Sequence, residues 1–467
     1  MIQPVILWTD ALIFLLLAAA VAFALYARRQ PHLRDPLHRV ARSPVGMASM
    51  VVLGAYLAIG LLDSLHFRPS LPGKPGAGVQ YAVETLSVLD WLATPLREQV
   101  EKTYSAPFAT HAYAKEAVEL PDGREARDFP RLKYGGAQLA DPAREKWPDI
   151  MTRALKAAVM ALAAWFLAAV GVCAWLAQRG GESLPAAWRD VWGGKTAIPW
   201  RVGLLALGVL FLLAFPTVAL STHYHILGTD KVGQDVFFQT LKSVRTGLVI
   251  GTLTTLVMLP FAVLLGIMAG YFRGWVDDGI QYLYTTLNSI PGVLLIAAAV
   301  LMMQVWMESN PDLFDTVAAR ADARLFFLCA ILGVTSWTGL CRLLRGETLK
   351  LRELDYIQAA QAFGVSHWRI ILRHILPNLM HIVLITVVMD FSGLVLAEAV
   401  LSYVGVGVDP TMQSWGNMIN SARLEMAREP MVWWTLAAAF LFMFVLVLFA
   451  NLFADTVRDA FDPRARR

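Results

Sequence analysis

The chain has 467 residues, of which 57% are hydrophobic and only 16% are charged, and its mean hydropathy is +0.52. This composition excludes an ordinary soluble protein, because about a quarter of the residues in such proteins are charged. The net charge of +4 gives no basis for a nucleic-acid-binding surface. We therefore expect an all-α, polytopic membrane protein.

Nine mostly apolar stretches approach or exceed the length that a helix needs to cross a bilayer, which is about 20 residues. No Lys or Arg precedes the first stretch, so we interpret it as a retained helix rather than a signal peptide. The nine predicted spans cover residues 6–26, 45–62, 155–176, 202–220, 248–270, 291–305, 325–340, 382–401 and 432–453.

Basic residues indicate the orientation of these spans. With nine spans, the Lys and Arg residues of 28–42, 179–201, 342–373 and 458–467 fall on the same side of the membrane. Basic loops favour the cytoplasm. We expect a periplasmic N-terminus and a cytoplasmic C-terminus, with the polar stretch of residues 63–151 outside.

The sequence predicts two regions. Residues 1–200 contain three of the spans and a polar insert at about residues 64–150, and we interpret them as an N-terminal extension. Residues 201–467 contain the other six spans and every informative motif, and we interpret them as the core.

A polar, amphipathic interruption at about residues 352–377 lies between two apolar segments of the core. Leu354, Ile357 and Ala360 have helical spacing, Gly364 allows a left-handed turn, and Ser366 can cap a second helix. We expect a helix, a sharp turn and another helix outside the membrane, followed by a new span that starts at Pro377.

Such a projecting segment is suited to docking another protein. The small side chains of Ala359 and Ala360 would allow a partner to approach closely, and Tyr356, Phe363 and Trp368 could fill its pockets. The alternative is a helix that lies on the bilayer surface, where Trp368 would also be suitable.

These residues resemble a known family. The spacing of Ala359-Ala360, Gly364 and Leu376-Pro377 is similar to the EAA loop in membrane permease subunits of binding-protein-dependent ABC importers, with Gln358 where that family usually has Glu. Five further matches resemble the second permease subunit of the oligopeptide/dipeptide/nickel class: HILGTDKVGQDVF at 225–237, Gly247 and Gly251 after Arg245, EAVLSYVGVGV at 398–408, SWGNMI at 414–419 and RDAFDPR at 458–464. The resemblance covers about residues 201–467, and the first 200 residues depart from it.

The resemblance implies a six-helix permease core in a bacterial inner membrane. It implies that the chain forms the translocation path for peptides, or for similar small solutes such as nickel, with a second homologous permease. A periplasmic solute-binding protein would deliver the substrate, and two ATPase subunits or domains would hydrolyse ATP. The ATPase-coupling residues would be Tyr356, Gln358, Ala359, Ala360, Gly364, Trp368, Leu376 and Pro377.

Two carboxylates fall in or near one span, Asp390 and Glu398. They are eight residues apart and so on roughly the same face of a helix. Ionisable groups at membrane depth suggest a functional site, and these two could line the translocation path. The alternative is that they tie neighbouring helices together.

No motif indicates catalysis, a cofactor or a metal site, and we expect the chain not to be an enzyme. His223, His225, Asp230 and Asp235 have a spacing that a metal could use, but a turn with side-chain hydrogen bonds explains the same residues. Two other functions remain as alternatives. A proton-coupled secondary transporter would use Asp390 and Glu398 as proton carriers, and a membrane-anchored enzyme or sensor would place its chemistry in residues 63–151, which contain His111, Glu116 and Asp122.

Overall fold

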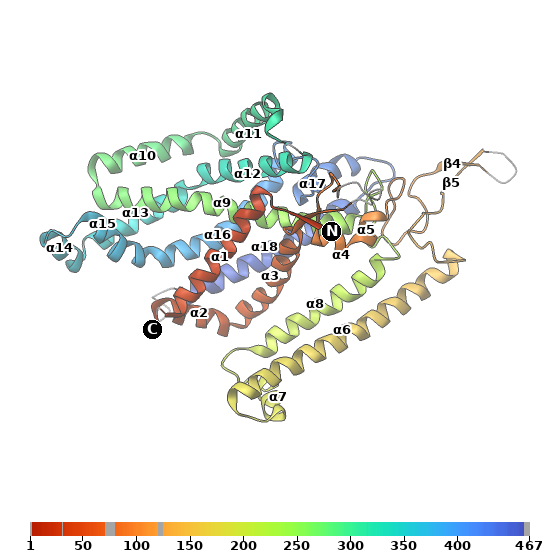
Figure 1. Cartoon of the computed structure of the whole chain (residues 1–467), viewed down its shortest axis with the longest axis horizontal. Coiled ribbons are helices and arrows are strands. Elements are labelled where there is room, and N and C mark those ends of the chain that lie inside the picture. The colour runs from red at the N-terminus through yellow and green to blue at the C-terminus, as the bar shows by residue number, and fades with distance from the viewer. Residues whose placement is uncertain (1, 30, 71–79, 120–124, 315, 462–467) are drawn as a thin grey trace.

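The computed structural model describes residues 2–29, 31–70, 80–119, 125–314 and 316–461, and these are predominantly helical (Figure 1). Asp122, Arg464, Arg466 and Arg467 lie outside the described residues. Within the described ranges, nine helical segments are long and apolar enough to cross a membrane, which confirms the predicted number and the all-α class. They are Trp8–Leu25, Pro44–Asp63, Pro142–Gly180, Trp200–Ser221, Val236–Phe272, Gly292–Ser309, Val317–Arg352, His367–Tyr403 and Trp434–Phe461.

The described elements have the following bounds. The strands are β1 (Ile2–Val5), β2 (His66–Pro69), β3 (Leu86–Ser87), β4 (Glu116–Glu119) and β5 (Glu125–Asp128). The α-helices are α1 (Trp8–Arg29), α2 (Pro31–Arg42), α3 (Pro44–Asp63), α4 (Val88–Leu92), α5 (Thr94–Glu98), α6 (Pro142–Gly180), α7 (Leu184–Trp192), α8 (Trp200–Ser221), α9 (Val236–Phe272), α10 (Gly274–Ser289), α11 (Gly292–Ser309), α12 (Val317–Ser336), α13 (Thr338–Arg352), α14 (Asp355–Ala362), α15 (His367–Ile370), α16 (Leu376–Tyr403), α17 (Trp415–Glu425) and α18 (Trp434–Phe461). A 3₁₀ turn covers Pro311–Leu313, and a π-helical turn covers Ile371–Ile375.

Helix α9 lies at the centre of the molecule and packs against α3, α12, α13 and α16. Gly247 and Gly251 on α9 allow this close packing. A Cβ at Gly247 would lie 2.9 Å from the Trp415 ring, and one at Gly251 would lie 2.5 Å from the Phe391 ring. Small residues of this kind let helices approach where the surrounding lipid offers no hydrophobic driving force.

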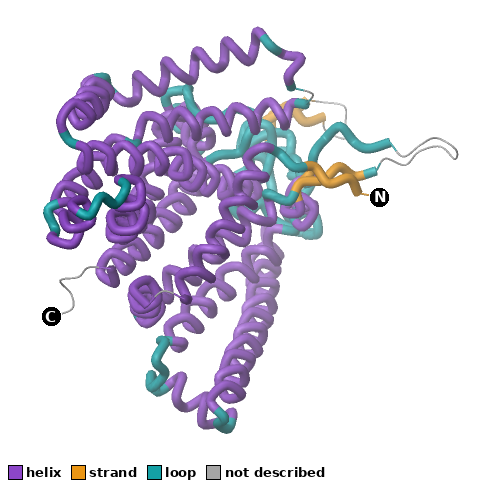
Figure 2. The backbone as a smooth tube through the Cα atoms, turned by 60° about the vertical axis from the view of Figure 1, so that its left-hand side comes forward, coloured by secondary structure: helices purple, strands orange, loops and turns teal. Residues whose placement is uncertain are grey.

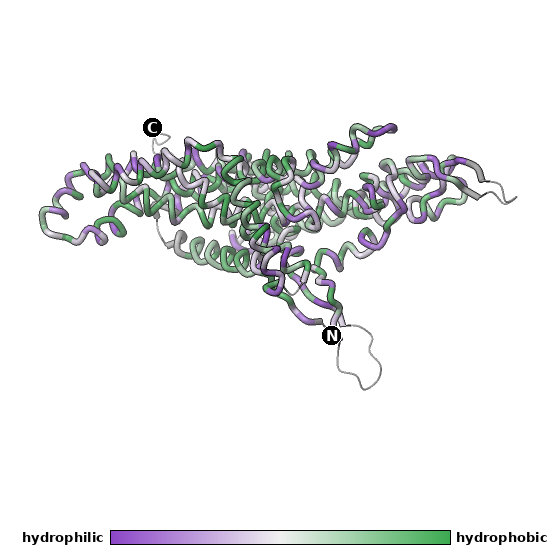
Figure 3. The backbone as a smooth tube through the Cα atoms, turned by 90° about the horizontal axis from the view of Figure 1, so that it is seen from above, coloured by the Kyte–Doolittle hydropathy of each residue, from purple (hydrophilic) through white to green (hydrophobic). Residues whose placement is uncertain are grey.

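Two ends of the molecule can be distinguished (Figure 1). The insert end carries the strands, α4, α5 and α17, and the opposite end, which we call the α14 end, carries α2, α14 and α15. Helix α7 lies away from both, at the tip of the hairpin that α6 and α8 form. Figure 3 shows that hydrophobic residues dominate the helices between the two ends. Helices α2 and α15 at the α14 end carry Arg34, Arg39, Arg42 and Arg369, and the orientation of the spans in the membrane stays a prediction.

The insert joins the start of α1 to the end of α3. Strand β1 precedes α1 and pairs antiparallel with β2, which follows α3, and β2 pairs with β3. A separate hairpin of β4 and β5 projects from the insert end (Figure 1). The insert therefore binds the first two spans together on one side of the membrane.

Helices α6 and α8 pack against each other and, with α7 between them, form a hairpin that stands apart from the other spans (Figures 1 and 2). Helix α8 also packs against α3, and α3 in turn packs against α9 and α18. The boundary at residue 200 stays a prediction, and the packing of the described helices does not divide at that residue.

A buried charge cluster attaches the insert to the segment before α9. The Nδ1 atom of His225 lies 2.7 Å from Asp235, and its Nε2 atom lies 3.4 Å from Glu101 of the insert. The Glu101 carboxylate also accepts hydrogen bonds from the backbone N–H groups of Lys133, Tyr134 and Gly135. One imidazole and two carboxylates thus link residue 101, residues 133–135 and residues 225–238.

The cluster determines two opposing pKa shifts. Burial alone would raise the pKa of Glu101, but the hydrogen bonds from His225 and the backbone outweigh burial and lower it to about 2. Burial alone would lower the pKa of His225, but Asp235 and Glu101 outweigh burial and raise it to about 9. At neutral pH the His225 imidazole is therefore protonated and faces the ionised carboxylate of Glu101.

We predict that attachment of the insert weakens at alkaline pH. Because the pKa of His225 is raised from 6.5 to about 9, its contribution to stability is fully present below pH 6.5 and is lost as the pH rises through 9. Hydrogen exchange at residues 99–105, corrected for intrinsic rates, should show more frequent opening at about pH 9.5 than at about pH 6. Glu101→Gln should lower the local opening free energy by about 2 kcal/mol or more, because it removes the charge that faces the imidazolium. The exposed control Glu98→Gln should change nothing, and equal protection at both pH values would contradict the prediction.

Candidate functional site

The interruption predicted at residues 352–377 forms a projecting pair of short helices, α14 and α15, at the α14 end (Figure 1). They connect α13 to α16. Asp355 lies in the first turn of α14, where a negative charge is favourable to the helix dipole. The predicted order of helix, turn and helix is confirmed.

The turn between the helices depends on Gly364. Its φ is +71°, in the left-handed region that side chains disfavour. The Gly364 N–H donates to the carbonyl of Gln361 at 3.0 Å, and the Val365 N–H donates to the carbonyl of Ala360 at 3.1 Å. This pair of bonds is a Schellman motif, which ends a helix and satisfies its last carbonyls.

The second helix differs from the prediction at both ends. Ser366 is at the N-cap position of α15, but its side chain makes no capping hydrogen bond. The α-helix α16 begins at Leu376 with Pro377 in its first turn, close to the expected start, but a π-helical turn joins it to α15, so that the helical segment is continuous over His367–Tyr403. The π-helical turn at Ile371–Ile375 precedes Pro377, which has no N–H, and Asn378 Nδ2 donates to the His374 carbonyl at 2.6 Å. The wider turn and this side-chain bond accommodate the proline inside a continuous helix.

The inner face of the pair is anchored in a hydrophobic cluster. Ile357 of α14 and Ile370 and Ile375 of the second helix are completely buried. They pack with residues of α9, α10, α13 and α16, and Ala360 and Val365 pack against the same cluster. The projecting pair is therefore seated on a rigid base rather than connected by a flexible loop.

The outer face exposes large aromatic side chains. Phe363 is 86% exposed, Trp368 53% and Tyr356 47%, while Ala359 is also exposed beside them. Ala360 points partly into the cluster, so the expected face of two alanines consists of Ala359 alone. Exposed aromatic residues on a rigid base are typical of a protein-docking surface.

Polar contacts hold Gln358 in a fixed position. Its Nε2 atom donates to the carbonyl of Glu353 at 3.3 Å and to the Glu353 carboxylate at 3.4 Å. The same carboxylate pairs with Arg273, at the connection between α9 and α10. Gln358 therefore contributes an uncharged amide that is already linked to α9 through Glu353.

Two further contacts brace this end of the molecule. The Arg345 guanidinium of α13 donates to both oxygens of Asp277 on α10, at 2.6 and 2.7 Å. This hydrogen bond lowers the pKa of Asp277, and the bidentate geometry fixes α10 against α13. The Tyr271 hydroxyl of α9 lies 2.9 Å from Nδ1 of His367, and Gln361 donates to it at 3.3 Å.

The two carboxylates of α16 have different surroundings. Glu398 is 3% exposed, and its Oε1 atom accepts a hydrogen bond from Ser402 at 2.7 Å. A Cβ at Gly416, at the start of α17, would lie 2.6 Å from the same oxygen, so Glu398 is enclosed between α16 and α17. Asp390 is only half-buried. A role of either carboxylate in the translocation path stays a prediction.

A buried charge cluster lies among the spans and was not predicted from the sequence. Arg245 of α9 lies 2.6 Å from Asp10 of α1 and 3.5 Å from Asp322 of α12. Arg245 also donates to Thr9 at 2.8 Å, and the Thr9 side chain contacts Asp322. Three spans are therefore linked through one guanidinium.

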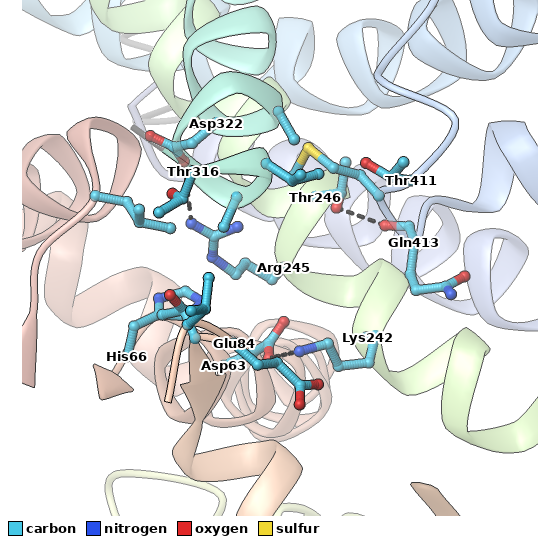
Figure 4. Close-up of a pocket in the computed structure, with 17 residues that line it drawn as sticks. Asp63, His66, Glu84, Lys242, Arg245, Thr246, Thr316, Asp322, Thr411 and Gln413 are labelled. Atoms are coloured by element: carbon cyan, nitrogen blue, oxygen red, sulfur yellow. Dashed lines mark hydrogen bonds and ion pairs between the residues drawn. The ribbon is translucent and has the colours of Figure 1, made fainter. Parts of the chain in front are cut away.

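A second cation lies one helical turn away on α9. Lys242 lies 2.7 Å from Asp63, at the end of α3, and 2.9 Å from Asp90 of α4. Both cations line a cavity of about 600 Å³ that also contacts Glu84 and Gln413. Figure 4 shows Lys242 directed toward Asp63, and Arg245 lying between Asp322 and His66. Asp10, a single charge within the first predicted apolar stretch, was the signal that could have identified part of this cluster.

The motif before α9 is a structured turn. Asp230 accepts hydrogen bonds from the backbone N–H groups of Val232 and Gln234, and Asp235 caps α9 by accepting from Phe238. Among the described residues, no group of three His, Cys, Asp or Glu side chains is arranged to hold a metal ion.

Comparison with known proteins agrees with this arrangement. Residues 262–467 match the family described as binding-protein-dependent transport system inner membrane component. This match includes α14, α15 and the continuous helix that ends at Tyr403.

Several curated relatives belong to transport systems for peptides. The chain is 34% identical to the glutathione transport system permease protein GsiD of Pectobacterium atrosepticum over 52% of this chain and 73% of that protein. It is 33% identical to the oligopeptide transport system permease protein OppC of Mycobacterium tuberculosis, over 52% of this chain and 77% of that protein. It is 28% identical to the dipeptide transport system permease protein DppC of Bacillus subtilis, over 60% of this chain and 86% of that protein.

The comparisons give no support to a proton-coupled secondary transporter. Membership in a binding-protein-dependent family implies an ATPase and a solute-binding protein as partners. The chain belongs to the binding-protein-dependent transport system inner membrane components, as a multi-pass permease subunit of an ABC importer of the peptide class.

Proposed function

We propose that α14 and α15 are the segment through which an ATPase drives this permease. The observation that carries the proposal is the combination of an exposed aromatic face with a fully buried inner face on the same two short helices. A docking segment must present such a face and must also resist bending when it is pushed. The Schellman turn and the buried isoleucines supply that resistance.

The proposed roles follow the position of each side chain. Tyr356, Ala359 and Trp368 contact the ATPase, Gln358 hydrogen-bonds to it, and Gly364 holds the two helices at their angle. Ala360 seats α14 on the cluster. Leu376 and Pro377 lie where the second helix passes into α16, so they transmit the movement to that span.

The movement has a direct structural route to the membrane. The cluster under α14 and α15 includes residues of α9, α10, α13 and α16. The pairs between Arg345 and Asp277 and between Tyr271 and His367 connect the same helices. When the ATPase closes on ATP, these helices tilt together and open the path on the other side of the membrane.

The complete importer contains a second homologous permease, two ATPase subunits or domains and a periplasmic solute-binding protein. One face of α16 supports the second permease as a neighbour. Met389, Gly393, Leu396 and Val400 recur at helical spacing, are exposed on this chain and are mostly apolar. Asp390 is next to this face, so it could reach a path between the two permeases, whereas enclosed Glu398 could do so only after α16 and α17 separate.

We propose that the substrates are peptides, with nickel or other small solutes as the alternative. The names of the curated relatives support peptides, since they refer to oligopeptides, dipeptides and glutathione. The chain itself performs no catalysis, and its partners hydrolyse ATP. Residues 1–200 are the extension, and residues 201–467 are the core.

The proposed orientation places the α14 end in the cytoplasm and the insert end in the periplasm. The N-terminus is then periplasmic and the C-terminus cytoplasmic. The basic residues of α2 and α15, which lie at the same end, support this orientation.

We predict that Gly364→Pro leaves the protein inserted but uncouples ATP hydrolysis from transport. Proline fixes φ near −65°, whereas Gly364 needs +71°, so the turn cannot form. In proteoliposomes containing the purified importer, substrate uptake should fall at least about tenfold, which corresponds to about 1.4 kcal/mol. Gly364→Asn is the matched control, because asparagine adopts left-handed conformations, and it should retain most of the uptake. Normal uptake by the proline variant would contradict the assigned role.

We predict that Ala359→Glu and Ala360→Glu both weaken ATPase binding, for different reasons. Ala359→Glu adds a bulky charge to the exposed face, and Ala360→Glu places a charge against the hydrophobic cluster and unseats α14. Affinity purification of the tagged chain should recover at least about tenfold less ATPase with either variant. Only Ala360→Glu should also lower thermal stability.

The control is Ala137→Glu, an equal substitution at an exposed alanine of the insert end. It should leave ATPase recovery unchanged. If the chain is purified without any ATPase or second permease in the wild type, the proposed assembly is wrong, whatever the variants do.

A further inference from the structure

An apolar groove lies beneath α1 in the membrane-spanning part of the molecule. It has a volume of about 530 Å³, and its lining is almost entirely apolar. Five spans contribute to it, α1, α3, α9, α16 and α18, through residues that include Phe23, Leu57, Leu256, Val388 and Phe453. The groove has the size of a typical small-molecule site, but its position restricts the ligand to something that is present in the bilayer.

The groove exists because α1 is attached mainly at its two ends. Near its start, Thr9 and Asp10 bind Asp322 and Arg245, so that α1 packs against α12 and α9. At its other end α1 packs against α2. Between these attachments it crosses the other spans, and small residues such as Ala19 and Ala20 leave space beneath it.

A cationic face of α2 lies beside the same end of α1. Arg34, His38 and Arg42 are four residues apart and share one side of the helix, with Arg39 next to them. These residues and Asp35 line a cavity of about 350 Å³. Arg34 lies 3.6 Å from Asp35, and within the described parts of the chain Arg39 and Arg42 have no ion pair.

The groove and the cationic face meet in one hydrophobic cluster. Val40, on the inner side of α2, is 4% exposed and packs with Val457 and Phe461 of α18. Phe23 and Phe453, which line the groove, pack against this cluster. The groove therefore leads to α2, the helix that carries the arginines and connects α1 to α3.

We propose that this corner of the permease binds an anionic phospholipid. An acyl chain occupies the groove beneath α1, and the phosphate is held by Arg34, Arg39 and Arg42 of α2. Guanidinium groups bind phosphate oxygens through paired hydrogen bonds, and basic residues at a membrane surface attract anionic lipids. An acidic protein surface could satisfy the arginines but could not fill a groove inside the bilayer, so the two features together favour a lipid.

The first test is native mass spectrometry of the detergent-solubilised importer with added lipid. Dioleoyl phosphatidylglycerol and dioleoyl phosphatidylcholine are compared at equal concentrations. We expect saturable binding of phosphatidylglycerol, with a preference of at least about tenfold over phosphatidylcholine. The preference should decrease as salt is raised, because salt screens the arginines, and this measurement needs only the wild-type protein.

Two variants separate the headgroup site from the groove. Arg34→Gln with Arg39→Gln and Arg42→Gln should remove the preference for phosphatidylglycerol. Ala20→Trp should fill the groove and reduce the binding of both lipids. The matched control neutralises three exposed basic residues near α7, with Arg189→Gln, Lys195→Gln and Arg201→Gln, and should keep the wild-type preference.

Three results would overturn the proposal. The first is wild-type binding that does not saturate or that ignores the headgroup, which indicates bulk lipid only. The second is an equal loss of preference in the α7 control set. The third is a triple arginine variant that retains its lipid but loses its ATPase, which would show that α2 contacts a protein instead.

Discussion

The pairing of Arg245 with Asp10 and Asp322 is the interaction on which the arrangement of the spans depends. A guanidinium inside the apolar body needs counter-charges, because removing one partner of a buried pair costs about 3–5 kcal/mol. Arg245 is on α9, the central helix, and its partners are on α1 and α12. One turn earlier on α9, Lys242 binds Asp63 and Asp90 in the same way. The two cations therefore position α1, α3 and the insert relative to α9. Arg245 also holds the start of α1 in the place that leaves a groove beneath this helix.

The two ends of the permease are joined by the same small set of helices. At the α14 end, α14 and α15 rest on a cluster formed by α9, α10, α13 and α16. At the insert end, α9 begins in a turn that His225 and Glu101 link to the insert, and α16 ends at α17, where Glu398 is enclosed. Helices α9 and α16 run between these ends. Helix α14 is therefore connected to the insert end by a continuous route of packed helices.

The helices of the first 200 residues are attached to the rest of the protein in two different ways. Helices α1 and α3 are attached to it by buried charges and by packing on α9. Helices α6 and α8 pack mainly on each other and contact α3, so they form a hairpin at the edge (Figure 2). The single extension expected from the sequence thus contains parts with separate structural roles.

The sequence by itself determined the nine spans, the projecting helix–turn–helix at residues 352–377 and the need for Gly364, because these depend on local hydrophobicity and on backbone conformation. The spacing of residues along the sequence could not show which charged side chains contact one another in the fold. Asp10, Arg245 and Asp322 are far apart in the chain, and only packing of α1, α9 and α12 brings them together. In the same way, the continuous helix through Pro377 depends on a π-helical turn and the Asn378 side chain, and the inward position of Ala360 depends on the cluster beneath it. Tertiary structure decided these features, because a buried charge or a proline is stabilised by its particular neighbours and not by its own position in the sequence.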